Sequence, residues 1–153
     1  MASVYLLHEG RILLLYRQGS SIVSNLWIGS AGGHFIENEL NDAKACMIRE
    51  LSEELSIDEA SLDCLSLRYI TIRYTDGELR QNYYFFANLR ESISQAPKST
   101  EGIAKWFSLD SLDDLPMPFT AHHVIKHYLS VGRFDSYLYG GLADRDGVHF
   151  YKL

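Results

Sequence analysis

Three glutamates in one short segment, Glu50, Glu53 and Glu54, are the residues whose types and spacing best suit chemistry. At about 100° per residue, steps of three and four place all three carboxylates on one face of a helix. Like charges at this spacing repel each other, and Arg49 is the one basic residue beside them. A hard divalent cation such as Mg²⁺ would neutralise them, because it takes oxygen ligands and stays open to phosphate oxygens. The alternative is a solvated helix face without a ligand.

A pair of glycines, Gly32 and Gly33, precedes the glutamates. Glycine allows positive φ and lets the backbone approach a ligand closely, because no Cβ stands in the way. A glycine loop that runs into a helix with three carboxylates is suited to cradle a metal ion and a diphosphate. The upstream glycines therefore favour the metal site over the solvated face.

The segment that must position the carboxylates begins at Asn41. It contains no Gly or Pro and is rich in Ala, Leu, Lys, Arg and Glu, which predicts a helix of roughly four turns, with Asn41 or Asp42 as its N-cap. Ile48, Leu51 and Leu55 fall on the side opposite the glutamates. We therefore expect this helix to dock on a sheet and to hold its three carboxylates on the outer side.

The other segments are predicted mainly as strands. Two hairpins are expected, from residues 3–7 and 11–17 about a turn at 8–10, and from residues 62–75 and 81–89 about a loop at 75–78. A short strand is expected at 103–109 and a helical turn at 110–115. A second helix is expected at 120–131, capped by Thr120 and ended by Gly132, before a terminal hairpin within 137–151.

Composition indicates one domain over residues 1–153, because 46% hydrophobic and 22% charged residues are ordinary for a globular domain of that length. A formal charge of -6 argues against indiscriminate nucleic-acid binding. The two cysteines, Cys46 and Cys64, form neither a zinc motif nor a disulfide framework, which favours a cytoplasmic location. The apolar start is interrupted by His8, Glu9 and Arg11, too early for a membrane span.

The stretch GGHFIENELNDAKACMIRELSEELSI resembles the Nudix box of the MutT-like hydrolase family. That box has a glycine, five residues, a glutamate, seven residues, and then Arg-Glu-aliphatic-x-Glu-Glu-x-Gly-aliphatic. Here Gly33 precedes Glu39 by five intervening residues, and residues 49–57 match the second half except at Ser56, which replaces the glycine. The opening hairpin, the Trp27 segment and the stretch 101–112 extend the resemblance over most of residues 3–130.

Two further departures lie upstream of the helix. Nine residues rather than seven separate Glu39 from Arg49, which leaves open whether these two side chains meet. Ala31 stands where a proline often precedes the paired glycines, and we expect this to loosen the loop. Ser56 should adopt a left-handed conformation at a cost of about 1 kcal/mol. None of these departures touches the three glutamates of the helix.

The resemblance implies an α/β (α+β) Nudix fold, a mixed β-sheet sandwiched between helices, with Mg²⁺ as cofactor and Mn²⁺ as a substitute. It assigns metal ligation to the side chains of Glu50, Glu53 and Glu54 and to the carbonyl of Gly32. It offers Glu50 and Glu101 as alternative general bases, with Arg49 orienting the loop or a helix carboxylate. The substrate-binding positions are Arg17, Gly33, His34 and Glu39.

Arg17 and two other features have alternative interpretations. The fork of donors on Arg17 suits a phosphate, but a surface arginine at the end of a strand fits equally well. His123 and His127 have the i, i+4 spacing of metal ligands on a helix, yet no glutamate lies between them, so packing is favoured. The aromatic run 83–86 could stack a base on one face, with core packing on both faces as the default.

The function that the resemblance implies is hydrolysis of a nucleoside diphosphate linked to another group. A nucleoside triphosphate such as oxidised dGTP is the first substrate expected, and ADP-ribose and nucleotide sugars are alternatives. A nucleotide-sensing module without turnover is disfavoured by the three retained glutamates, and a messenger-RNA 5′-end pyrophosphohydrolase by the charge of -6. The partners expected are a small nucleotide and, by family analogy, a second copy meeting the aromatic tail Tyr137–Tyr151.

Overall fold

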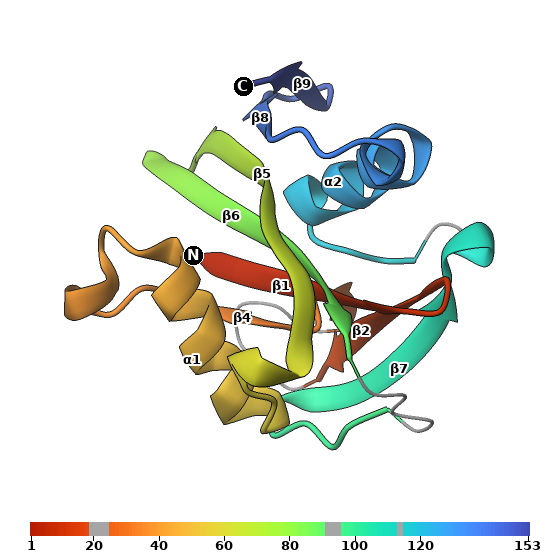
Figure 1. Cartoon of the computed structure of the whole chain (residues 1–153). Helices are drawn as coiled ribbons and strands as arrows, with labels where there is room; N and C mark the ends of the chain where they lie inside the picture. Colours follow the sequence, from red (N-terminus) through yellow and green to blue (C-terminus); the bar gives the residue numbers. More distant parts are fainter. Residues whose placement is uncertain (19–24, 91–95, 113–114) are drawn as a thin grey trace.

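A mixed β-sheet runs between two helices in the computed structural model, which describes residues 1–18, 25–90, 96–112 and 115–153 (Figure 1). Its strands are β1 (Ala2–His8), β2 (Arg11–Arg17), β3 (Leu26–Ile28), β4 (Ala31–Gly33), β5 (Leu62–Thr75), β6 (Glu78–Leu89), β7 (Gly102–Ser108), β8 (Tyr139–Ala143) and β9 (Val148–Lys152). The α-helices are α1 (Ala43–Leu55) and α2 (Phe119–Ser130). Short 3₁₀ turns are η1 (Glu37–Glu39), η2 (Glu59–Ser61), η3 (Leu109–Ser111) and η4 (Gly132–Phe134).

Both predicted hairpins are present, and both turn on a pair of residues with positive φ. Glu9 and Gly10 join β1 to β2 with φ values of 47° and 72°, and Asp76 and Gly77 join β5 to β6 with values of 55° and 81°. Two successive positive φ angles give a tight turn whose twist matches that of the strands. Because this turn needs only two residues, β6 begins at Glu78, ahead of the predicted start at residue 81.

The strand order is β3-β2-β1-β6-β5-β8-β9, with β4 also pairing with β1 and β7 with β2. β1 runs parallel to β6, and β8 runs parallel to β5, whereas the other pairs are antiparallel. The sheet is therefore mixed, as expected. The terminal hairpin is confirmed as β8 and β9, which extend the sheet beyond β5.

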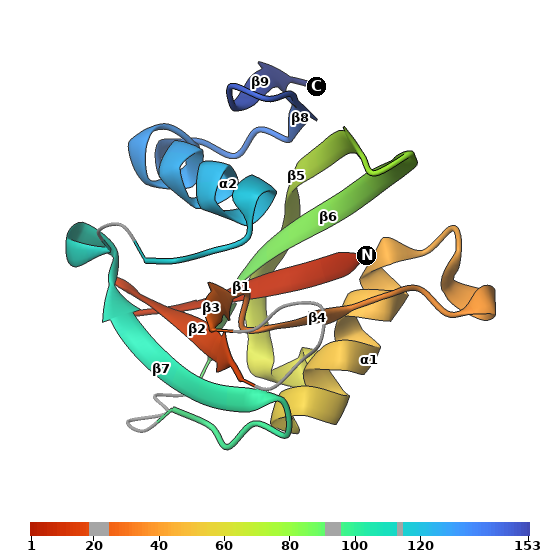
Figure 2. The same ribbon diagram turned by 180° about the vertical axis from the view of Figure 1, so that it is seen from behind.

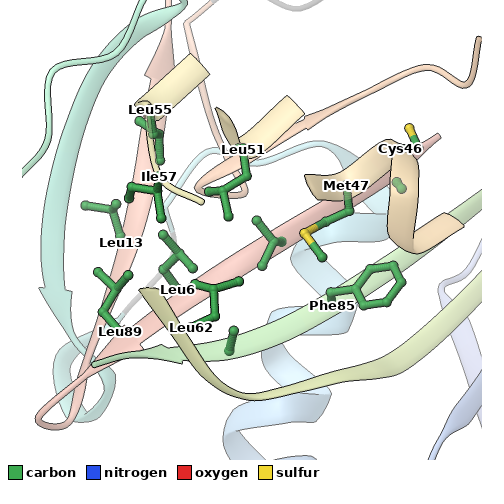
Figure 3. Close-up of a cluster of buried hydrophobic side chains, with 14 residues drawn as sticks. Leu6, Leu13, Cys46, Met47, Leu51, Leu55, Ile57, Leu62, Phe85 and Leu89 are labelled. Carbon is green, nitrogen blue, oxygen red and sulfur yellow. The ribbon is translucent and has the colours of Figure 1, made fainter. Parts of the chain in front are cut away.

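Each face of the sheet has its own hydrophobic core, because α1 and α2 lie on opposite sides of the strands (Figure 2). On the first face, Met47, Leu51 and Leu55 of α1 point toward side chains of the sheet that include Leu6 and Phe85 (Figure 3). The second core includes Tyr5, Tyr69, Tyr84, Phe86, Val124 and Tyr128, and it lies between the sheet and α2. Core packing on both faces of β6 is thus confirmed.

The ends of α1 follow the sequence closely. Asp42 is the N-cap, and its Oδ1 accepts a hydrogen bond of 2.9 Å from the backbone N–H of Ala45. Ser56 ends the helix with φ 55° and ψ 35°, the left-handed conformation that the missing glycine predicts.

The start of α2 differs from its prediction. Pro118 precedes the first turn, where its fixed φ of -55° suits a helix start. Thr120 lies within the helix and does not cap it; its hydroxyl accepts a hydrogen bond of 3.0 Å from Tyr84 in the second core. The helical turn expected at 110–115 begins as η3, and its residues 113–114 lie outside the described part. No described helix is long and apolar enough to cross a membrane.

Candidate active site

Helix α1 holds two of the three glutamates, Glu50 and Glu54, against β4 and leaves the third on the outer side. Glu53 has a side chain that is 60% exposed, whereas Glu50 is partly buried and Glu54 is buried. The backbone N–H of Gly32 in β4 donates a hydrogen bond of 3.1 Å to Oε2 of Glu54. The prediction of one outward carboxylate face is therefore wrong for Glu54, because β4 packs along α1 and covers it.

Glu54 is the electrostatically perturbed carboxyl of this group. The pKa of Glu54 is raised to about 7, mainly by burial and to a smaller extent by the negative charges of Glu50 and Glu101, while the Gly32 N–H and the charge of Arg17 act in the opposite direction. Each of these neighbours is close enough to act on Glu54. The structure thus gathers four predicted site residues, from β2, β4, α1 and the segment before β7, around one buried carboxyl.

Arg49 ties the helix to the loop before it. Its Nε and Nη2 donate to the two carboxylate oxygens of Glu39, at 2.7 and 3.0 Å. Its Nη1 donates to Glu50 at 2.7 Å and to Glu53 at 3.1 Å, and its Nη2 also donates to the carbonyl of His34 at 3.1 Å. The open question is answered: Glu39 reaches Arg49 despite the two additional residues. Hydrogen bonds from Arg49 lower the pKa of Glu39 to about 2.

The two glycines are needed for close packing rather than for positive φ. Gly32 and Gly33 are extended residues of β4, paired with Ser3 and Ala2 of β1. A Cβ on Gly33 would overlap the carboxyl group of Glu50. The expectation of close approach is confirmed, and that of positive φ is wrong, because pairing with β1 holds both glycines extended.

The residue before the glycines does not loosen this segment. Ala31 is buried and pairs with Val4 of β1 in the same ladder. Its small side chain packs in the first core, among residues that α1 also covers. Strand pairing therefore fixes the approach to the glycines without the proline that was expected there.

Arg17 and Glu101 meet across the ends of two paired strands. Nη2 of Arg17 lies 2.9 Å from Oε2 of Glu101, and Arg17 at the end of β2 pairs in register with Gly102 at the start of β7. Both side chains remain partly accessible. The candidate phosphate-binding cation and the candidate base are thus partners in one ion pair beside Glu54.

The sequence gives no sign of the contact that anchors the Glu101 segment to α1. The backbone N–H of Thr100 donates a hydrogen bond of 3.2 Å to the carbonyl of Glu54, and Ser99 Oγ accepts from the N–H of Glu101 at 3.1 Å. Backbone contacts between distant segments depend on the fold and leave no motif.

The histidine pair on α2 lies in the second core region and does not form a metal site. Nδ1 of His127 lies 3.0 Å from the Tyr69 hydroxyl, and Nδ1 of His123 lies 2.9 Å from the carbonyl of Phe119. These contacts confirm the packing interpretation. Within the described residues, no three His, Cys, Asp or Glu side chains stand close enough to hold a metal ion as arranged. The carboxylates of Glu50 and Glu53 are paired with Arg49.

Comparison with known proteins gives the same fold. A family model described as NUDIX domain matches residues 2–128. A MutT protein from Bacillus halodurans is 18% identical, with 99% of this chain and 95% of that chain covered and a TM-score of 0.61. An Ap4A hydrolase from C. elegans is 20% identical, with coverage of 71% and 77% and a TM-score of 0.52.

A third solved structure with this fold is a bifunctional NMN adenylyltransferase/ADP ribose pyrophosphatase from Francisella tularensis, in complex with AMP and a manganese ion. It is 17% identical, with 84% of this chain and 40% of that chain covered and a TM-score of 0.56. A comparison with curated proteins finds no match. Because the family model spans most of the chain, including the helix and the strand that hold these carboxylates, the chain belongs to the Nudix (MutT-like) hydrolase family.

Proposed function

We propose that this protein is a Mg²⁺-dependent hydrolase that cleaves a diphosphate bond in a nucleotide. The leading substrate candidate is a nucleoside triphosphate such as oxidised dGTP. The observation that carries the proposal is the buried carboxyl of Glu54, set beside the like charges of Glu50 and Glu101. A carboxyl in this position costs folding free energy at neutral pH unless a cation accompanies it. Oxygen donors arranged in this way suit a hard divalent ion.

The residues that would hold the cation are Glu50, Glu53, Glu54 and the carbonyl of Gly32. When bound there, Mg²⁺ neutralises phosphate charge and lowers the pKa of a coordinated water, and Mn²⁺ can replace it. Arg49 now pairs with Glu50 and Glu53, so these two carboxylates turn from Arg49 when they act as ligands. Glu39 keeps Arg49 in place through its two hydrogen bonds during that change.

The remaining roles concern the base and the substrate. We propose Glu50 and Glu101 as alternative bases that accept a proton from the attacking water, and each adds negative charge around Glu54. Arg17 presents guanidinium donors for a phosphate oxygen, and we propose that its present partner Glu101 leaves it when the substrate binds. Gly33 lies against the Glu50 carboxyl, and the carbonyl of His34 accepts a hydrogen bond from Arg49. We propose that the substrate diphosphate lies beside these two residues.

We further propose that residues 1–153 act as one domain in the cytoplasm. β8 and β9 lie beyond the part of the chain that the family model matches, yet they continue the same sheet through β5. The substrate within the nucleotide class is chosen by loops rather than by the fold. Dinucleoside polyphosphates, ADP-ribose and nucleotide sugars are therefore the competing substrates, since proteins of similar structure include an Ap4A hydrolase and an ADP ribose pyrophosphatase.

The experiment that tests the function is product analysis with Mg²⁺ over nucleoside triphosphates, oxidised dGTP, ADP-ribose, dinucleoside polyphosphates and nucleotide sugars. Glu53→Gln should remove a metal ligand and most turnover while the protein stays folded. Glu59→Gln is the matched control, because Glu59 is also an exposed glutamate in one ion pair near α1, with Lys44. Equal rates for wild type and Glu53→Gln would refute the metal face. If no substrate of the panel gives product although the protein still binds Mg²⁺ and nucleotide, the result would indicate the sensing module instead.

A further inference from the structure

One half of the sheet is covered by a helix on one side only. Around β5, β6, β8 and β9, helix α2 packs on one face, where Tyr69, Tyr139 and Phe150 surround His127. On the opposite face, five large apolar side chains are each between 56% and 72% exposed. These residues, which we call the open face, are Tyr74, Leu79, Leu142, Tyr151 and Leu153.

The strand register places these side chains on the same face. Tyr74 pairs with Leu79 across the β5–β6 hairpin, and Ile72, two residues before Tyr74, pairs with Leu142 of β8. Because side chains alternate along a strand and paired residues share a side, all four lie on one face. Gly140 shares the face with Leu142 and pairs with Tyr151.

Leu153 completes the open face, because a Cβ on Gly140 would come within 3.1 Å of the Leu153 side chain. The open face therefore spans four adjacent strands, from the tip of the β5–β6 hairpin to β9, and it is continuous along the register.

The strand residues that share this face carry no permanent charge. Besides the open face, they are Ile70, Ile72, Gln81, Tyr83, Gly140 and His149. The carboxylate of Asp144 in the β8–β9 turn meets them, 3.1 Å from Nε2 of His149. The charged residues of the same strands are directed to the other side: Arg73 pairs with Arg80, and Lys152 pairs with Tyr139. In a chain with 22% charged residues and a net charge of -6, such a surface does not have the composition of a solvated sheet face.

We propose that the open face binds a second copy of this chain, and that the protein is a homodimer with a two-fold interface of sheet against sheet. Two copies with a charge of -6 each repel one another, and a surface whose strand residues are uncharged is where they meet at a low electrostatic cost. Two uncovered sheet faces pack on each other about 10 Å apart, as in a β-sandwich.

The size of the open face supports the same occupant. Its two tyrosines and three leucines expose roughly 600 Å² in total, at the upper end of what a typical monomer leaves in one apolar patch. A standard interface buries about 800 Å² on each partner, so the neighbouring half-buried residues of the same face complete the area.

The interface would border the segment between β4 and α1, whose Glu39 is hydrogen-bonded to Arg49. The ring of Phe35, just after β4, packs edge-on against Tyr83 of β6 at 5.8 Å, where the covered part of this face ends. The following segment, with Ile36 and Leu40 exposed, lies below the free end of the β5–β6 hairpin in both views (Figures 1 and 2). A second copy on the open face therefore lies beside the loop that carries Glu39.

The test is the mass of the full chain in solution, by light scattering or sedimentation, over a series from about 1 to about 100 µM. Wild type is expected at twice the 17.5 kDa of one chain. Leu142→Glu places a charge in the centre of the open face and should give 17.5 kDa over most of the series. Ile103→Glu is the matched control, because Ile103 is an aliphatic strand residue on β7 with 57% exposure, against 56% for Leu142, and it should stay dimeric.

Tyr74→Glu is a second variant, at the hairpin tip, and should also give the mass of one chain. If the wild-type protein has the mass of one chain at every concentration, the proposal is overturned, and another partner or segment must cover the open face. A dimer that both Leu142→Glu and Tyr74→Glu leave intact would overturn it as well, because the interface would then lie elsewhere. Mass is measured without substrate or metal, so neither result depends on the proposed function.

Discussion

Replacing Glu54 by glutamine should stabilise the protein without metal while it abolishes the metal site. Glutamine keeps the size of the side chain and an oxygen that accepts from the Gly32 N–H. It removes the charge that burial and the neighbouring Glu50 and Glu101 disfavour. We therefore expect that Glu54, which the proposed function requires, lowers the stability of the folded protein without metal.

The magnitude follows from the pKa of Glu54, which rises from 4.5 to about 7 on folding. Between these two values the folded state holds a proton that the unfolded state has lost, so stability falls as the pH rises through this window. Full ionisation above pH 7 corresponds to at most about 3 kcal/mol, and because solvent reaches part of the group we expect about 1–2 kcal/mol. For a chain of this length, that is an increase in Tm of roughly 3–6 °C.

The assay is thermal unfolding of wild type and Glu54→Gln in EDTA at pH 8 and pH 5, with Glu59→Gln as the control. The gain in Tm should be present at pH 8 and should shrink at pH 5, where wild-type Glu54 is protonated. Added Mg²⁺ should raise the Tm of wild type and not that of Glu54→Gln. A variant less stable than wild type at pH 8, or one with the same gain at both pH values, would refute this account of Glu54.

Three other substitutions have defined outcomes. Gly33→Ala should displace the Glu50 carboxyl and lower turnover about 100-fold in a protein that still folds, as circular dichroism and initial rates would show. Arg49→Lys cannot make both hydrogen bonds to Glu39, so turnover should fall and the loop before α1 should gain amide hydrogen exchange; unchanged exchange would contradict the role of this pair. Ser56→Gly should stabilise the protein by about 0.5–1 kcal/mol in urea titrations, because glycine adopts the left-handed cap without strain.

The parts that the sequence predicts well are those governed by neighbours along the chain. Helix α1, its Asp42 cap and the left-handed Ser56 follow from local pattern and capping preference. The two hairpins follow from Gly10 and Gly77, which favour tight turns. For the same reason, the side chains of Leu51 and Leu55 were correctly placed against the sheet.

The parts that escape prediction depend on contacts between distant segments. Periodicity placed Glu54 on the outer side of α1, but it contains no information about the strand that covers it. The ion pair of Arg17 with Glu101 joins residues 84 positions apart. The spacing between Glu39 and Arg49 could not tell whether they meet, because the path of the intervening residues is set by η1 and by packing on β4.

The parallel pairing of β1 with β6 determines when this protein can fold during synthesis. Val4 pairs with Phe85, and Leu6 pairs with Ala87. The first strand to leave the ribosome therefore cannot complete its pairing until the sixth has been synthesised. Closing so long a loop is slow, whereas the β5–β6 hairpin needs only its own two-residue turn. We therefore expect that hairpin to nucleate folding. A nascent chain that ends before residue 78 would hold β1 with only β2 and β4 as partners, so the edge of β1 that pairs with β6 would be open and in need of chaperone protection.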